Sequence, residues 1–153
     1  MCLIIDANMC GRFFATPASA DFVPVWQWLE GRDGAIVFGG RNARELWRVA
    51  NAGRAILELH RRGKAHRVEY ARVDKEEARL AAARSCRSDD PHVIALARIG
   101  GSRLLCSEDA DLHADFSNTT LLSDPKGRIY QNAGHKGLLR KYGHTKACRM
   151  HPH

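Results

Sequence analysis

The stretch from Asp90 to Leu112, DPHVIALARIGGSRLLCSEDADL, decides the fold class of this chain. An acid followed by proline favours the start of a helix, and Gly100–Gly101 favours its end. The apolar segment RLLCS then predicts a buried strand, and a run of acids follows it at once. A helix that leads into a buried strand with acids behind it is typical of a parallel sheet with a functional site at the carboxyl ends of its strands.

Similar alternation continues on both sides of this block. Apolar and alternating segments predict further strands at residues 2–6, 34–40, 66–73 and 119–123. Helical spacing predicts helices at residues 19–31, 41–63, 74–86 and 108–116. Strands that are apolar on both faces and alternate with helices indicate an α/β protein. We therefore expect a three-layer α/β/α fold with a central, mainly parallel sheet.

The charge of the chain is unevenly distributed. Its net charge is +7, and from Lys126 onward there are seven basic residues and no acid, so the residues before it are neutral as a group. We divide the chain into a domain at residues 1–125 and a basic C-terminal extension at residues 126–153. A contact with a phosphate backbone and a solvated terminus both account for such an extension.

Targeting and membrane signals are missing from the sequence as given. The apolar run after Met1 is interrupted by Asp6 and is too short for a signal peptide. No segment approaches the roughly 18 apolar residues of a membrane span. The five cysteines form no CxxC pair, so a zinc site is not indicated. We expect a cytoplasmic protein without a membrane partner.

Carboxylates from separate segments are expected to meet at one edge of the sheet. Asp6 ends the first strand, Asp109 and Asp111 follow RLLCS, and Asp90 and Glu45 lie near the starts of helices. Each has an ordinary alternative, either as a helix cap or as a surface ion pair, but an acid that ends an apolar strand is partly buried and needs a partner. Several carboxylates share a site at neutral pH when a divalent cation lies between them, and oxygen ligands favour Mg²⁺ or Mn²⁺.

These residues resemble the PIN-domain nucleases, a family of small α/β/α proteins. The resemblance covers Leu3 to about Phe116 and rests on three segments: LIIDAN, GGRNARELWRV and the block that begins DPHVIALAR. It implies a site for one or two Mg²⁺ or Mn²⁺ ions with Asp6, Asp90, Asp109 and Asp111 as ligands, and it leaves Asp89 open as an alternative to Asp90. Glu45 would act with Asp6, Asp90 and Asp109 in catalysis. Substrate contacts are expected from Asn8, Arg41, Arg44 and Ser107.

The implied activity is metal-dependent endoribonuclease cleavage of RNA, in a toxin–antitoxin system, in defence or in RNA processing. An antitoxin or inhibitor protein is an implied partner. Cleavage of flap or single-stranded DNA is an alternative, as is an inactive PIN-like module that binds RNA or protein. A phosphotransfer receiver domain is a weaker rival, because DANMC offers one acid where that chemistry needs several. The apolar residues of VWQWLEG and Phe13–Phe14 belong either to the core or to a homodimer face.

Overall fold

The computed structural model describes residues 2–142 of the chain. The basic residues Lys146 and Arg149 and the last three histidines of the sequence lie outside the described residues. The strands are β1 (Cys2–Ile5), β2 (Ala35–Phe38), β3 (Ala65–Arg67), β4 (Leu104–Cys106) and β5 (Arg128–Ile129). The α-helices are α1 (Cys10–Phe13), α2 (Val23–Glu30), α3 (Gly40–Arg48), α4 (Ala52–Arg61), α5 (Tyr70–Ala82), α6 (Pro91–Gly100), α7 (Ala110–Phe116) and α8 (Lys136–Tyr142), with short 3-10 turns η1 (Ala7–Met9) and η2 (Ala133–His135).

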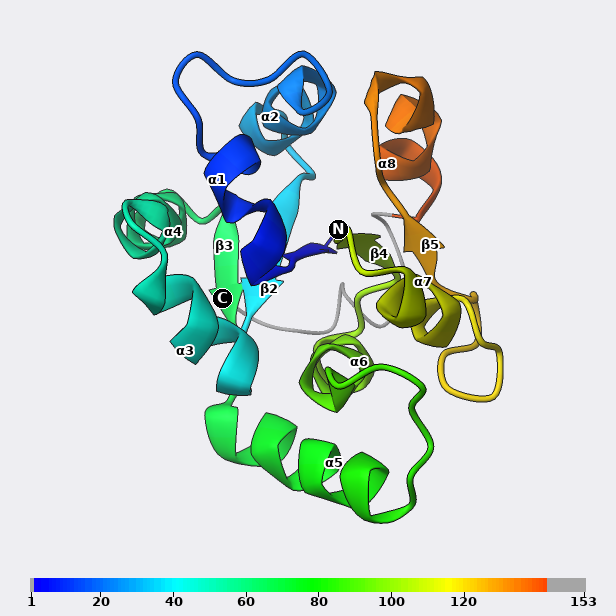
Figure 1. The fold of residues 1–153 in the computed structure, drawn as a ribbon. Helices are drawn as coiled ribbons and strands as arrows, with labels where there is room; N and C mark the ends of the chain where they lie inside the picture. The colour runs from blue at the N-terminus through cyan, green and yellow to red at the C-terminus, as the bar shows by residue number, and fades with distance from the viewer. Residues whose placement is uncertain (1, 143–153) are drawn as a thin grey trace.

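The strands form one parallel sheet in the order β3-β2-β1-β4-β5. Helices lie on both faces of this sheet, with α1 and α2 on one side and α5 and α6 on the other (Figure 1). This arrangement confirms the predicted three-layer α/β/α fold. Strand β1 lies at the centre of the sheet, parallel to both of its neighbours. The carboxyl ends of β2 and β4 therefore lie close to the carboxyl end of β1.

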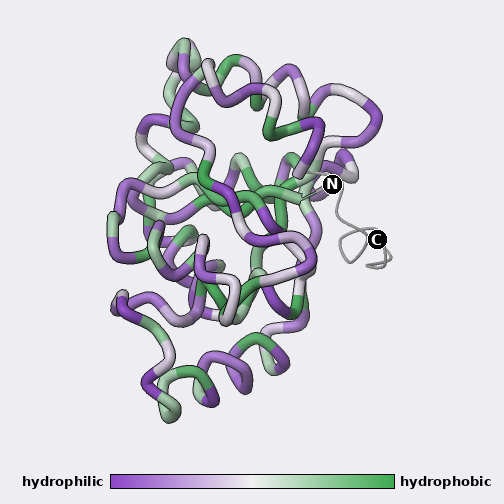
Figure 2. Tube along the Cα trace, turned by 90° about the vertical axis from the view of Figure 1, so that its right-hand side faces the viewer, coloured by the Kyte–Doolittle hydropathy of each residue, from purple (hydrophilic) through white to green (hydrophobic). Residues whose placement is uncertain are grey.

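Two hydrophobic cores form because successive side chains of a strand point to opposite faces of the sheet. Leu3 and Ile5 of β1 pack in a core with α1, α2, α4 and α8, whereas Cys2 and Ile4 pack in a second core with α5, α6 and α7. Figure 2 shows hydrophobic residues concentrated in the central strands and hydrophilic ones along the outer segments. The sheet is therefore buried on both faces, as expected for parallel strands.

The aromatic residues near the N-terminus belong to the first core. The Phe13 ring centroid lies 5.0 Å from that of Trp26 and 5.4 Å from that of Phe22. The Trp26 Nε1 donates to the carbonyl oxygen of Phe13 at 3.0 Å. Of the two interpretations of VWQWLEG and Phe13–Phe14, this packing supports a core role for Phe13 and Trp26, whereas Val23 is exposed.

Three predicted elements differ from the structure. The helix expected at residues 41–63 is two helices, because Val49 is extended and Asn51 adopts a left-handed φ of 67°. The strand expected at residues 66–73 ends at Arg67, and α5 begins at Tyr70 because the spacing of Val73 and Leu80 suits a helix that packs on α6.

The strand expected at residues 119–123 is a turn. Asn118 Oδ1 accepts hydrogen bonds from the backbone nitrogen and the hydroxyl of Thr120, and such local bonds compete with a strand ladder. The last strand comes instead from Arg128–Ile129. Residues 128–142, which the sequence places in the basic extension, supply this edge strand and α8, whose Leu139 and Tyr142 are buried in the first core.

No helix within residues 2–142 is both long enough and apolar enough to cross a lipid bilayer.

One ion-pair cluster links the helices of the second core. Glu76 of α5 accepts from Arg79 at 2.6 Å and from Arg98 of α6 at 2.7 Å, and these arginines lower its pKa to about 2. A carboxylate with a lowered pKa stabilises the fold above its unfolded pKa and loses this contribution as the pH falls toward the folded value. Glu76→Gln should therefore lower the free energy of unfolding at pH 7 by on the order of 1 kcal/mol.

Urea unfolding measured between pH 7 and pH 3 checks this expectation. The difference between the wild type and Glu76→Gln should shrink as the pH falls. Lys75→Gln, at the neighbouring exposed position, serves as the control and should show no such trend. A difference for Glu76→Gln that stayed constant across this range would contradict the ion-pair explanation.

Candidate functional site

The ends of β1 and β4 bring Asp6, Ser107 and Asp109 together. Ile5 is in register with Cys106, and the Asp6 backbone nitrogen donates to the Cys106 carbonyl oxygen at 2.9 Å. The buried Ser107 hydroxyl donates to Asp6 Oδ2 at 2.7 Å and accepts from the backbone nitrogen of Asp109 at 3.1 Å. One serine oxygen therefore links the Asp6 carboxylate to the segment that carries Asp109.

Asp109 is also the N-cap of α7. Its Oδ1 accepts from the backbone nitrogens of Asp111 at 2.9 Å and Leu112 at 3.2 Å. Both capping bonds use Oδ1, so Oδ2 is left for another partner. The capping interpretation of Asp109 and its interpretation as a site residue are therefore compatible.

Helices α3 and α6 add the remaining side chains of the cluster. Asn42 of α3 donates from Nδ2 to the Ile5 carbonyl oxygen at 3.1 Å, which holds the start of α3 against the end of β1. Glu45 lies one turn further along α3, with Oε2 3.2 Å from Nε2 of His92. Asp90 precedes α6 and makes no side-chain capping bond, and its Oδ1 lies 3.9 Å from His92 Nδ1. Asp90 therefore faces the cluster and does not cap its helix.

His92 is a residue of this cluster that the sequence analysis missed. Its side chain is fully buried between Glu45 and Asp90, and within residues 2–142 neither ring nitrogen makes a well-aligned hydrogen bond despite the short distance to Glu45. Buried polar groups nearly always have a hydrogen-bond partner. A signal was present in the sequence, because His92 is the sole polar residue in the run PHVIALA and lies two positions after Asp90.

The carboxylates of the cluster interact electrostatically. Burial is the main cause that raises the pKa of Asp6, and the charge of Glu45 raises it further, whereas the Ser107 hydroxyl and His92 lower it. Burial also raises the pKa of Asp90, and the charges of Asp6, Glu45 and Asp109 add to that effect. Asp6, Glu45, Asp90 and Asp109 therefore lie close enough to oppose one another's ionisation. We name these four acids, together with His92, the acid cluster.

The acid cluster suits a divalent cation by its chemistry. It combines carboxylate oxygens, which are typical ligands of Mg²⁺ and Mn²⁺, with a buried imidazole that lacks a hydrogen-bond partner. Within residues 2–142, no group of three or more histidine, cysteine or acidic side chains is already arranged around one metal position. Binding of a cation here would require these side chains to rotate toward a common point.

The other predicted ligands and substrate residues occupy different places. Asn8 lies beside the cluster, with Nδ2 3.4 Å from the Ser107 hydroxyl that binds Asp6. Arg41 pairs with Glu45 at 3.0 Å, at the edge of the cluster. Arg44 is engaged elsewhere, because its guanidinium makes two bonds of 3.0 and 2.7 Å to Asp74 of α5.

Two acids near the cluster lie outside it. The Asp111 side chain is 62% exposed and pairs with Arg87 at 3.4 Å. Asp89 is exposed and belongs to a separate hollow beside Arg84 and Cys86. Asp90, and not Asp89, is therefore the acid that the start of α6 contributes to the cluster.

Two further acids after β4, Glu108 and Asp115, have structural roles. Glu108 pairs with Arg12 at 3.0 Å. Asp115 is buried, and its two oxygens accept from the backbone nitrogens of Arg87 and Ser88, each at 2.8 Å. Asp115 therefore holds the loop that precedes Asp90, a role that the sequence analysis did not assign to it.

Comparisons of the chain with models of protein families, with curated proteins and with solved structures found no match.

The raised pKa of Asp6 has a consequence for stability. The folded state binds a proton on Asp6 more tightly than the unfolded state does, so ionised Asp6 destabilises the fold at neutral pH. Asp6→Asn removes this charge and keeps an oxygen that can accept from Ser107. We expect it to raise the melting temperature at pH 7, with a gain that diminishes as the pH falls and wild-type Asp6 becomes protonated.

Thermal unfolding without divalent metal, at pH 7 and at stepwise lower pH, measures this gain. Asp111→Asn is the matched control, because that carboxylate is exposed, and its melting temperature should stay close to the wild-type value at pH 7. Destabilisation by Asp6→Asn at pH 7 would contradict the assignment of Asp6 as a buried, unneutralised carboxylate.

Proposed function

We propose that this chain is a metal-dependent nuclease of the PIN type that hydrolyses phosphodiester bonds in RNA. The observation that carries the proposal is the acid cluster. Four separate segments contribute carboxylates to it, and burial and mutual repulsion raise the pKa of Asp6 and of Asp90. A cluster that costs stability in this way is typical of a functional site. RNA as the substrate follows from the resemblance to the PIN-domain nucleases.

Asp6, Asp90 and Asp109 are the residues that would hold Mg²⁺ or Mn²⁺. Such a cation acidifies water and stabilises the negative charge that develops on the attacked phosphate. Ser107 orients Asp6, and the cap of α7 fixes the backbone of Asp109. Because Ser107 is buried against Asp6, we assign it to positioning that carboxylate and not to substrate contact.

Glu45 is placed to accept a proton from the attacking water. Its carboxylate has one oxygen 3.0 Å from Arg41 Nε and the other 3.2 Å from His92 Nε2, so both oxygens have a neighbour that orients them. Its side chain is 25% exposed, which leaves it accessible from solvent. Arg41 is half exposed beside it and is a candidate phosphate contact, whereas Arg44 is bound to Asp74.

Site variants test the nuclease proposal directly. Asp6→Asn and Asp109→Asn should each lower cleavage of a fluorescently labelled single-stranded RNA in Mg²⁺ or Mn²⁺ by about 100-fold or more, because each removes a ligand charge. Asp111→Asn should retain most of the activity, because Asp111 is exposed and faces Arg87.

A matched DNA oligonucleotide in the same assay separates RNA cleavage from the alternative of DNA cleavage. Full cleavage by both Asp6→Asn and Asp109→Asn would end the proposal. A metal requirement is checked independently by calorimetric titration of the wild-type chain with Mn²⁺.

His92 should act on the reaction through the carboxylates that it contacts. Partners of metal ligands typically change metal affinity or activity by about 10- to 100-fold when they are replaced. We expect His92→Gln to weaken Mn²⁺ binding or slow cleavage within that range while circular dichroism shows a folded chain. Wild-type values of both quantities in a folded His92→Gln chain would show that the imidazole is only a core residue.

A further inference from the structure

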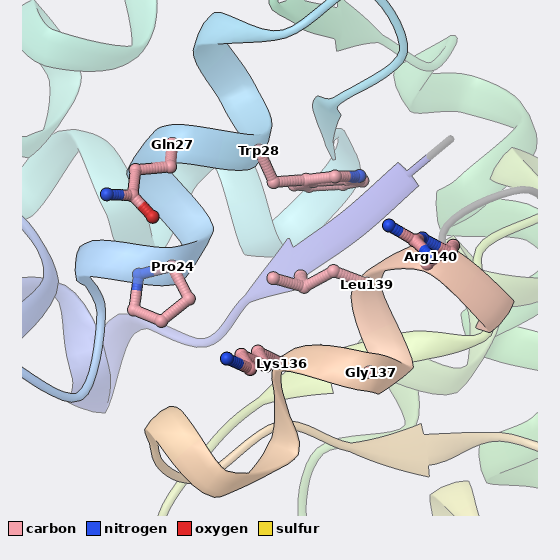
Figure 3. Close-up of a pocket in the computed structure, with 7 residues that line it drawn as sticks. All are labelled: Pro24, Gln27, Trp28, Lys136, Gly137, Leu139 and Arg140. Carbon is pink, nitrogen blue, oxygen red and sulfur yellow. The ribbon is translucent and has the colours of Figure 1, made fainter.

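A hollow lies between α2 and α8, away from the acid cluster. Its volume is about 490 Å³, and its walls include Pro24 and Trp28 of α2 and Lys136, Leu139 and Arg140 of α8 (Figure 3). No residue of the acid cluster lines it. Its volume falls within the usual range of small-ligand sites, roughly 300–1,000 Å³. We call it the α2–α8 groove.

One end of the α2–α8 groove lies toward the carboxyl edge of the sheet, where the acid cluster is. Strand β5 is parallel to β4, so it ends at this edge, and Lys136 begins α8 only a few residues later. Figure 3 shows Pro24 and Lys136 toward the head of the β1 arrow, and Trp28 and Arg140 further back along the strand. The groove therefore leads away from the edge that carries the cluster.

The residues just before α2 contact both the end of β5 and the acid-bearing segment after β4. The Tyr130 hydroxyl donates to the Asp21 carbonyl oxygen at 2.6 Å. Arg12 bridges the carboxylates of Asp21, at 3.1 Å, and Glu108, at 3.0 Å. Because Glu108 is next to Asp109, Arg12 links the start of α2 to the edge of the acid cluster.

The groove walls offer hydrogen-bond donors and an aromatic ring without matching acceptors. Within residues 2–142, neither Lys136 nor Arg140 forms an ion pair, and the buried Trp28 Nε1 has no hydrogen-bond partner. In Figure 3 the nitrogen end of the indole ring lies on the side of Arg140. Buried indole N–H groups usually find an acceptor, and guanidinium groups favour phosphate. The Trp28 Nε1 is covered in this structure, so an anionic oxygen that binds Arg140 would reach the indole N–H after a shift of the side chains that cover it.

We propose that the α2–α8 groove binds a nucleotide of a single-stranded RNA whose chain extends to the acid cluster. This inference rests on the proposed function and adds to it a surface by which the chain would hold its RNA substrate. The base would pack against Trp28, and Lys136 and Arg140 would contact phosphates, which is the combination by which proteins bind single strands. Because the acid cluster repels a polyanion, the substrate needs cations elsewhere, and α8 supplies three, Lys136, Arg140 and Lys141, that form no ion pair within residues 2–142.

Binding without cleavage isolates the groove. The full-length Asp6→Asn chain, with no divalent metal, is titrated into a fluorescein-labelled eight-nucleotide RNA and followed by anisotropy over a series of salt concentrations. When Lys136→Ala and Arg140→Ala are both introduced into this Asp6→Asn parent, RNA binding should weaken about tenfold at low salt. The slope of log affinity against log salt should fall by roughly 1 to 2. Trp28→Leu should weaken binding about tenfold, and Trp28→Phe should restore most of it.

The control pair is Arg72→Ala with Lys75→Ala, which removes the same charge from the exposed face of α5 on the other side of the sheet. It should leave affinity within about twofold of the parent, since charges beyond a Debye length are largely screened. Thermal melts establish that each variant is folded, and the Lys136 and Arg140 pair carries the test if Trp28→Leu does not fold.

Several results would overturn the proposal: no binding by the parent, parent-like affinity in the Lys136 and Arg140 pair, or an equal loss in the α5 control. Binding of a polyglutamate peptide with the same Trp28 dependence would also overturn it. Comparable binding of the matched DNA octamer would support it, because base faces and phosphates are common to both. If the wild-type chain binds RNA through the groove but cleaves no RNA, the nuclease proposal alone is refuted. If the wild-type chain cleaves RNA but the groove variants bind RNA as tightly as the parent does, only the groove proposal is refuted.

Discussion

The buried hydrogen bond from Ser107 to Asp6 is the contact on which the organisation of the site depends. It is 2.7 Å long and joins the residues that immediately follow two adjacent parallel strands. Because Ser107 also accepts from the Asp109 backbone, a single hydroxyl sets the relative positions of two acids about a hundred residues apart in sequence. The alternation of side chains in β1 leaves no freedom to shift this register without exchanging the two cores.

The acid cluster illustrates a conflict between stability and function. Burial raises the pKa of Asp6 and of Asp90, so each ionised carboxylate opposes folding at neutral pH. Two other acids in the chain have partners that stabilise their ionised form. Glu76 has two arginine partners and a lowered pKa, and Asp115 accepts two backbone hydrogen bonds. Asp6 and Asp90 instead have acidic neighbours whose charges add to the rise of their pKa, which is why we propose the cluster as a cation site.

The distribution of cations complements the cluster. Arginines on the helices around the cluster are largely occupied, since Arg44 binds Asp74 and Arg98 binds Glu76. Lys136 and Arg140 of α8 form no ion pair within the described part of the chain. They lie beside Trp28, in a hollow that is distinct from the cluster but leads from the same edge of the sheet. A nucleic-acid substrate would connect these two regions. Its negative charge is attracted by Lys136 and Arg140, and in the absence of a metal it is repelled by the acid cluster.

The α/β class, the central parallel sheet and the acids at strand ends follow from the amino-acid sequence alone, because strand and helix periods and the polarity of helix starts are local properties. The sequence also located Asp6, Glu45, Asp90 and Asp109, since the carboxyl ends of parallel strands meet at one edge. It did not separate Asp109 from Asp111 or Asp90 from Asp89, because neighbouring acids are equivalent until packing decides which one faces inward.

The remaining features depend on how the elements pack together. The tertiary structure divided residues 41–63 into two helices, because Asn51 takes a left-handed conformation that periodicity does not reveal. It placed residues 128–142 in the sheet and the first core, although their charge suggested a separate extension. It also brought His92 between Glu45 and Asp90 and Trp28 beside Arg140. These pairings join residues that are distant in sequence, and only the packing of helices on the sheet brings them into contact.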